Sequence, residues 1–335
     1  MTMPPKVISR AATLTDVARA AGVGESTASR VLRNKGSFSH DVHDRVLQAA
    51  RNLNYVPNRI AGTLASTGSQ LIGVIIPALT TSVFPDLLRG SNSVLESAGY
   101  QSVIGVTEYE AAREEQLIES ILSWRPAGIL IAGLEHTDRG RAMLKDSGVR
   151  VVEVGDTDGQ GIDIVVGFSN RGAGQAAAEY LLRRKYRRIG YVGNEATDDL
   201  RAGKRYEGFK TTLAAAGLAL VDEEITPGLS SIKAGHDGLM RLLKREPNLE
   251  VVYFANDDMA IGGYFHCLAN GISVPDALAL FGHNGLDVGR LAPQPLSTIR
   301  TPRVAVGEIG AKLLLSRGPS QVIDLGFELF EGMTT

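Results

Sequence analysis

Short apolar runs alternate with stretches of helical periodicity from Leu71 onward, and this alternation limits the possible folds more than any other feature of the sequence. The runs span residues 71–76, 102–106, 128–132, 150–154, 162–166, 188–192, 251–254 and 278–281. Most are continuous rather than alternating, which is typical of parallel strands buried on both faces. Helical patterns lie between them, for example at 85–98, 110–123, 172–184 and 203–216. We therefore predict an α/β body with parallel sheets.

The length of the chain predicts more than one compact unit. The chain has 335 residues, whereas a single hydrophobic core stops growing at roughly 250–300 residues. The strands fall into two sets, so we expect a body of two similar lobes. Ligands of such sheets bind outside the carboxyl ends of the strands.

Charge separates the first part of the chain from the rest. Residues 1–68 carry nine Lys or Arg and four Asp or Glu, a net charge of +5. The whole chain is −2, so the remainder is −7. A small basic segment on a larger acidic body favours a polyanion-binding module, although +5 alone is also within ordinary surface variation.

The basic segment has the pattern of three short helices. Thr13 and Asp16 have the spacing of a capping box at the start of the first helix. Residues 22–24, Gly-Val-Gly, interrupt that helix, and a second helix of about 25–32 follows. Ser39 then caps a third helix, whose expected apolar stripe is Val42, Val46, Ala49, Ala50 and Leu53. A tight turn between two short helices predicts a helix-turn-helix domain whose second helix enters the major groove of DNA.

The second helix of this segment carries the expected base-reading side chains. Its first turn holds Glu25, Ser26 and Thr27, and Arg30 lies about one turn further along. Arg30 can bind a guanine edge or a phosphate, and Glu25 can accept from cytosine or simply face solvent. Side chains suited to phosphate contacts are Thr13, Thr15, Ser29 and Asn34.

Two stretches of this segment resemble the DNA-binding head of LacI/GalR-family repressors. The first is TLTDVA (13–18) with AGVGESTASRVL (21–32), and the second is NYVPNRIA (54–61). Gly24 departs from the family, which usually caps the second helix with Ser. The resemblance implies a hinge helix that folds on the operator, where Leu64 wedges between base pairs; alternatively, Leu64 is only a linker residue. The implied hinge contacts are Asn58, Arg59, Ala61 and Leu64.

The body resembles the effector domain of the same family, which is similar to type I periplasmic sugar-binding proteins. The matching stretches are RYEGF (205–209), ANDDMA (255–260), FGHN (281–284) and PLSTI (295–299). The resemblance implies that Asn256 meets the ligand and that Asp257 caps the next helix. It also implies a helix-turn-helix head over 1–57, a hinge over 58–68 and a two-lobed body over 69–335. The N-lobe is expected at about 69–167 and 300–318, and the C-lobe at about 168–299 and 319–335.

Effector identity rests on fewer residues. Asn284 stands where neutral-sugar members often carry Asp, and Arg201, Lys204, Arg205 and Arg300 would favour an anion if they face the cleft rather than solvent. Residues 282–289 and 296–303 resemble the branch that controls gluconate use, so a sugar acid or its phosphate is favoured over a neutral sugar or nucleobase. The candidate effector residues are Ser82, Phe84, Thr107, Asp156, Arg201, Arg205, Asn256 and Asn284.

Several other classes of protein are disfavoured. The chain shows no nucleophile elbow, Walker loop or metal-spaced histidine pair, so we expect no catalytic residues, no metal and no cofactor. The lone Cys267 fits a reducing compartment. No apolar run approaches the ~18–20 residues that cross a bilayer, and no signal peptide is recognisable, so a cytoplasmic location without membrane contact is expected. These absences also disfavour an α/β enzyme or an exported solute-binding protein.

The hypothesis that follows is a homodimeric transcriptional regulator, most simply a repressor, that a small-molecule effector releases from a palindromic operator. Apolar faces on the body, including the one around residues 87–95, are the expected dimer contacts. Residues 172–174, Gly-Ala-Gly, are interpreted as close helix packing, and Cys267 as a small core residue. The sequence does not distinguish a repressor from an activator.

Overall fold

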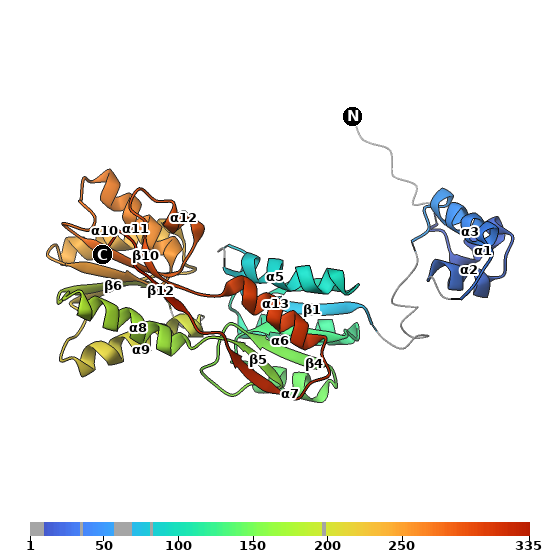
Figure 1. Ribbon diagram of the computed structural model, residues 1–335, viewed down its shortest axis with the longest axis horizontal. Coiled ribbons are helices and arrows are strands. Elements are labelled where there is room, and N and C mark those ends of the chain that lie inside the picture. Colours follow the sequence, from blue (N-terminus) through green and yellow to red (C-terminus); the bar gives the residue numbers. More distant parts are fainter. Residues whose placement is uncertain (1–9, 34–35, 57–68, 81–82, 196–198) are drawn as a thin grey trace. The chain divides into compact units, whose positions relative to one another are not determined.

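A computed structural model describes residues 10–33, 36–56, 69–80, 83–195 and 199–335. The chain divides into two compact units, Met1–Gly68 and Ser69–Thr335 (Figure 1). The expected hinge at 58–68 falls outside the described residues. The candidate residues that also lie outside them are Asn34, Asn58, Arg59, Ala61, Leu64 and Ser82.

The described residues of the first unit form three helices, as the sequence predicted: α1 (Leu14–Ala21), α2 (Glu25–Leu32) and α3 (His40–Asn52). The capping box of α1 is confirmed, since Thr13 accepts from the backbone of Asp16 and the Asp16 carboxylate accepts from the backbone of Thr13. Gly22 ends α1 at φ 65°, a left-handed conformation that favours glycine. The buried core of this unit consists of Val17, Ala18, Ala21, Ala28, Val31, Val46, Ala49 and Ala50.

The second unit begins with the sheet of the N-lobe, in which helices cover both faces. Its strand order is β11-β5-β4-β3-β1-β2, and every pairing is parallel. The strands are β1 (Leu71–Ile76), β2 (Gln101–Val106), β3 (Gly128–Ala132), β4 (Arg150–Val154), β5 (Ile164–Gly167) and β11 (Gln321–Asp324). Its helices are α5 (Val83–Ser97), α6 (Ala111–Ser123), α7 (Asp138–Asp146) and α13 (Arg303–Leu314). Strand side chains alternate between a cluster shared with α5 and α13 and one shared with α6 and α7.

The sheet of the C-lobe has the same plan, in the order β12-β10-β9-β8-β6-β7, with β12 antiparallel to β10. The strands are β6 (Ile189–Asn194), β7 (Asp222–Thr226), β8 (Val251–Phe254), β9 (Ala279–Asn284), β10 (Ser297–Arg300) and β12 (Glu328–Phe330). The helices are α8 (Asn170–Arg183), α9 (Leu200–Ala215), α10 (Ile232–Arg245), α11 (Asp257–Ala269) and the short α12 (Asp287–Arg290). The architecture is therefore the predicted two-lobed, type I periplasmic-binding-protein-like body.

Glycines let the covering helices pack closely in pairs. A Cβ at Gly174 of α8 would lie 1.9 Å from the carbonyl oxygen of Arg205, and one at Gly208 of α9 would lie 2.2 Å from that of Arg171. The interpretation of residues 172–174 as close helix packing is thus confirmed. Gly307 of α13 meets the carbonyl oxygen of Leu87 in the same way, at 2.1 Å.

Three expectations about the fold need correction. Strand β11 pairs with β5 in the first sheet, so residues 321–324 lie in the N-lobe and the last crossing to the C-lobe falls after Asp324. The face of α5 that carries Leu87 and Leu95 is buried within the N-lobe cluster that also includes α13, so it is not free for a dimer contact. Leu53, expected in the apolar stripe of α3, is the C-cap of that helix and is exposed.

Candidate functional site

The outer face of α2 carries the side chains expected to read DNA. Glu25, Ser26 and Arg30 are exposed, while Thr27 and Ser29 are half-buried. The Arg30 guanidinium lies over the ring of Phe38, 5.5 Å from its centroid. On the same helix, Ser29 accepts a hydrogen bond from Arg33 at 2.6 Å. Thr15 is exposed on α1, whereas the hydroxyl of Thr13 is already bonded to Asp16.

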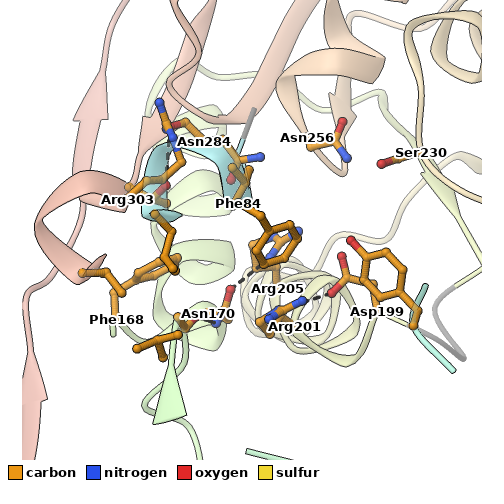
Figure 2. A pocket seen from close by; sticks show the side chains of 17 residues that line it. Phe84, Phe168, Asn170, Asp199, Arg201, Arg205, Ser230, Asn256, Asn284 and Arg303 are labelled. Carbon is orange, nitrogen blue, oxygen red and sulfur yellow. Dashed lines mark hydrogen bonds and ion pairs between the residues drawn. The ribbon is translucent and has the colours of Figure 1, made fainter. Parts of the chain in front are cut away.

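A cavity opens in the second unit, between the carboxyl ends of the strands of the two lobes. Figure 2 shows its wall, which brings together Phe84, Arg201, Arg205, Asn256 and Asn284, five of the candidates from the sequence. The other lining residues are Val83, Leu87, Tyr109, Val154, Gly155, Phe168, Asn170, Asp199, Ser230, Thr301, Arg303 and Val306. The wall is thus a mixture of apolar side chains, amides and three arginines.

Arg205 is buried in this wall and has no carboxylate partner among the residues that the structure describes. Its guanidinium donates to Asn170 Oδ1 at 2.9 Å and to the carbonyl of Ala255 at 3.3 Å, both neutral acceptors. Its Nε is buried with no hydrogen-bond partner among the described residues. A buried cation compensated only by neutral groups favours an anionic ligand.

Arg201 lies on the same helix, one turn before Arg205, and crosses toward the N-lobe. Its guanidinium stacks over the ring of Phe84, 5.3 Å from the centroid, and pairs with Asp199 at 3.6 Å. Tyr109 stands nearby in the left-handed region at φ 65°, a conformation of the kind that often marks binding sites. Burial is the main cause that raises the pKa of the Tyr109 hydroxyl, so this group stays neutral.

Arg303 is the third arginine of the cavity, and the sequence analysis missed it. It begins α13, pairs with Asp86 of α5 at 3.0 Å and donates to the carbonyl oxygen of Asn284. Asn284 itself has φ 112°, and the hydrogen bonds from Arg303 and Thr301 to its carbonyl hold it in that strained conformation. The Thr-Pro-Arg sequence at the crossover was the only signal that could have marked Arg303.

Two N-lobe candidates do not reach the cavity. Asp156 is completely buried and its carboxylate is bound to Lys204 and Asn170. The Thr107 hydroxyl accepts from the backbone N–H of Tyr109 at 3.2 Å, so it serves the turn after β2. Both were chosen because they follow strands, but local hydrogen bonds occupy their polar groups. Neither lines the cavity.

Two of the basic side chains expected near the cleft are also engaged elsewhere. Lys204 contacts Glu135 and Asp156, outside the cavity wall. Burial alone would lower the pKa of Lys204, but its contacts with Asp156 and Glu135 outweigh burial and raise it. Arg300 lies over the ring of Phe330, 3.8 Å from its centroid. Only Arg201 and Arg205 of the four expected bases therefore line the cavity.

Asn256, and not Asp257 as expected, caps helix α11. Asn256 lines the cavity and is also the N-cap of α11, because its side chain accepts from the backbone of Met259 at 3.0 Å. Asp257 is fully buried and accepts from Leu286 and Thr298 instead, tying α11 to the turn after β9 and to β10. Burial raises the pKa of Asp257 to about 7.

The part of the chain that the structure describes contains no candidate metal site and no candidate membrane-spanning helix. No group of three or more His, Cys, Asp or Glu there is placed to hold a metal ion. Cys267 is a buried core residue, and His136 lies between Glu114 and Glu153 in the N-lobe. No helix among the described residues has the length and hydropathy required to span a bilayer.

Family models match both units. Residues 13–58 match the model described as bacterial regulatory proteins, lacI family, and residues 69–318 match periplasmic binding proteins and sugar binding domain of LacI family. The chain belongs to the LacI family. As a LacI-family member with an intact helix-turn-helix head, it is a DNA-binding transcriptional regulator.

Individual LacI-family proteins resemble this chain over nearly its whole length. It is 39% identical to the HTH-type transcriptional regulator GntR of Pseudomonas aeruginosa, covering 96% of this chain and 95% of that protein. GntR of Escherichia coli is 36% identical, with 95% and 97% covered. A solved LacI-family transcriptional regulator from Silicibacter pomeroyi is 41% identical, with a TM-score of 0.91 and coverage of 96% and 99%.

Proposed function

We propose that this protein is a homodimeric repressor of sugar-acid catabolic genes, released from a palindromic operator by an aldonic acid such as gluconate. Two heads related by a two-fold axis would bind two half-sites, and effector binding would favour the DNA-released state. The similarity to regulators named GntR supports this choice. Such a regulator acts where bacterial DNA lies, in the cytoplasm, and performs no chemistry on its effector.

The charge of the cavity carries the proposal. Arg201 is compensated by Asp199 and Arg303 by Asp86, whereas Arg205 has no acidic partner among the described residues. One positive charge is therefore left for a ligand, which matches one carboxylate better than a doubly charged phosphate ester. This balance favours the free sugar acid over its phosphate. Asn256, Ser230 and Asn284 offer the amide and hydroxyl groups that a polyol chain needs.

A binding and release assay tests the effector. Gluconate should raise the melting temperature of the body and release a fluorescent operator duplex from the protein. Glucose should do neither at the same concentration, and phosphogluconate should act only at much higher concentration. If glucose or a purine releases DNA and gluconate does not, the proposal is wrong.

The operator contacts are proposed from the exposed face of α2. Replacing Arg30 with alanine should weaken specific operator binding by roughly 5- to 150-fold, because a bidentate arginine–guanine contact contributes about 1–3 kcal/mol of discrimination. Arg51, which is exposed near the end of α3, gives a matched control. Gel shifts at fixed salt measure both variants, and effector binding by the body should be unchanged. An Arg30→Ala variant that shifts operator at the wild-type concentration would contradict this role.

The proposed contacts at described positions are Thr13, Thr15, Glu25, Ser26, Thr27, Ser29 and Arg30.

The homodimer is proposed to form through the C-lobe. Phe265 and Leu268 are exposed on α11, and Leu291 at the end of α12 is 85% exposed. Exposed apolar side chains on neighbouring elements favour a protein contact over solvent. Sedimentation of a Leu291→Asp variant should show a weakened dimer. If the Leu291→Asp variant dimerises as strongly as wild type, the dimer interface lies elsewhere on the protein.

A further inference from the structure

One face of α9 carries three basic side chains with different partners. Arg201, Lys204 and Arg205 are spaced i, i+3 and i+4, so they project from the same side of the helix. Arg201 and Arg205 line the effector cavity, whereas Lys204 does not. Lys204 therefore sits between the two cavity arginines without facing the effector.

Lys204 spans the two lobes. Its Nζ lies 2.5 Å from Glu135 Oε1 and donates to Asp156 Oδ2 and, at 3.2 Å, to the carbonyl oxygen of Asp158. All three acceptors belong to N-lobe segments, since Glu135 follows β3 and the two aspartates follow β4. The ammonium group thus satisfies its three donors entirely with the opposite lobe.

Burial makes this contact different from a surface ion pair. The Asp156 side chain is completely buried and that of Lys204 is 13% exposed, while Glu135 is 36% exposed. Breaking a buried pair leaves an uncompensated charge, which destabilises the arrangement far more than losing an exposed pair does. Asn170 of the C-lobe donates to the same Asp156 carboxylate at 3.2 Å, so the contact is part of a network across the cleft.

We propose that Lys204 is a positioning residue that clasps the two lobes before the effector binds and so holds Arg201 and Arg205 at the cavity. Because Lys204 belongs to the same helical face, fixing its Nζ on the N-lobe fixes the turn of α9 that carries both arginines. The clasp also neutralises two carboxylates beside a cavity that we propose to bind an anion. The second part of this inference rests on the proposed effector, but the first part does not.

The distance between the lobes in effector-free protein tests the clasp directly. Spin labels at Lys145→Cys on α7 and Lys244→Cys on α10 report this distance, and the natural Cys267 is buried and does not compete for label. In a Lys204→Met background the distance distribution should broaden and shift to longer values. Lys204→Arg should keep the distribution narrow because it retains the charge. An unchanged distribution in Lys204→Met would overturn the proposal.

Lys210 provides the matched control on the same helix. Its Nζ lies over the ring of Tyr206 at 4.9 Å, within the C-lobe, and its side chain is exposed. Lys210→Met makes the same chemical change and should leave the distance distribution as it is. If Lys204→Met does not fold, Glu135→Gln removes one acceptor of the clasp at a half-exposed position and should broaden the distribution to a smaller degree. No broadening in that variant would equally overturn the clasp.

Effector affinity gives the second measurement. Gluconate should bind Lys204→Met at least about tenfold more weakly than wild type by calorimetry, because free energy that now closes the lobes must come from the ligand. Lys210→Met should stay within twofold. If wild-type protein binds no aldonic acid, the proposed function fails, while the label distances still decide the clasp. Equal affinity in Lys204→Met and wild type would contradict the positioning role.

Discussion

The two walls of the proposed effector cavity differ in the chemistry of their side chains. The N-lobe lines it mainly with apolar and aromatic groups, among them Phe84, Leu87 and Val154, whereas the C-lobe presents Arg201, Arg205 and a series of amides and hydroxyls. The polar wall carries Arg205, which has no acidic partner in the described part of the chain, and the apolar wall supplies the ring of Phe84, on which Arg201 stacks. We propose that the C-lobe selects the ligand, whereas the N-lobe shapes and closes the site.

The largest effect should come from the charged wall. Arg205→Gln removes the buried cation of this wall while keeping a planar polar group, and we expect gluconate affinity to fall at least about 100-fold, since hydrogen bonds to charged groups contribute about 1.5–3 kcal/mol each. Affinity for operator without effector should persist. Calorimetry measures the first property and fluorescence anisotropy the second.

Arg171 is the control for this variant. It lies on α8 in the same lobe but pairs with Glu207 near the surface, so Arg171→Gln should change gluconate affinity less than about twofold. A similar loss in both variants would mean that general positive charge, and not Arg205 at the cavity, attracts the effector. The division between the walls would then lose its basis.

The difference between the walls also explains how much of the site the sequence could predict. Arg205 lies in a recognisable motif within α9, Asn256 in one at the start of α11 and Asn284 in one at the end of β9, and all three line the cavity. In the N-lobe, Thr107 and Asp156 were chosen only because they follow strands, and neither lines it. Position after a strand does not reveal whether a neighbour such as Lys204 already occupies a carboxylate. Arg303 was missed because its role depends on Asn284, a contact between residues of different lobes.

The fold was more predictable than the site, since most elements carry local signals. Apolar runs marked the central strands, and the capping box and glycine turn marked the head. Strand β7 was missed because its sequence, DEEIT, lies at a sheet edge and buries few side chains. Strand β11 was assigned to the wrong lobe because only its pairing with β5 decides where it belongs.

Two glycine-to-alanine variants compare the effect of helix packing on stability with its effect on ligand binding. Gly208→Ala would place a Cβ against the backbone of α8, and Gly307→Ala would do the same between α13 and α5. Each should destabilise its lobe by about 1–3 kcal/mol through overpacking. Gly208→Ala moves the helix that carries Arg201 and Arg205, whereas Gly307→Ala moves α13 and α5, which carry Arg303 and Phe84. Gly208→Ala should therefore weaken gluconate binding by several-fold more than Gly307→Ala does. Denaturation curves and calorimetry measure the two effects. Equal loss of affinity in both variants would argue against selection by the C-lobe alone.

A pH effect should appear in the N-lobe. Burial alone would lower the pKa of His136, but contacts with Glu114 and Glu153 outweigh burial and raise it to about 9. Its folded-state pKa exceeds the unfolded value of about 6.5, so its contribution is complete below that pH and is lost as pH rises through about 9. We expect the free energy of unfolding of the body to fall by at least about 1 kcal/mol over this window. His136→Gln should flatten this dependence, whereas His40→Gln in the head, an exposed site, should not. If the free energy of unfolding of His136→Gln still falls with pH over this window, another group causes the pH dependence.

The smallest effect should come from the apolar wall. Phe84→Leu keeps most of the buried volume but removes the ring under Arg201, and a partly desolvated cation–π contact contributes about 1 kcal/mol. We expect gluconate affinity to fall roughly fivefold. Because the ring carries no charge, the preference for gluconate over glucose should stay as in wild type, in contrast to Arg205→Gln. Competition binding with both sugars measures that ratio. If Phe84→Leu erased the preference, the N-lobe would take part in selection and the two walls would not divide the work.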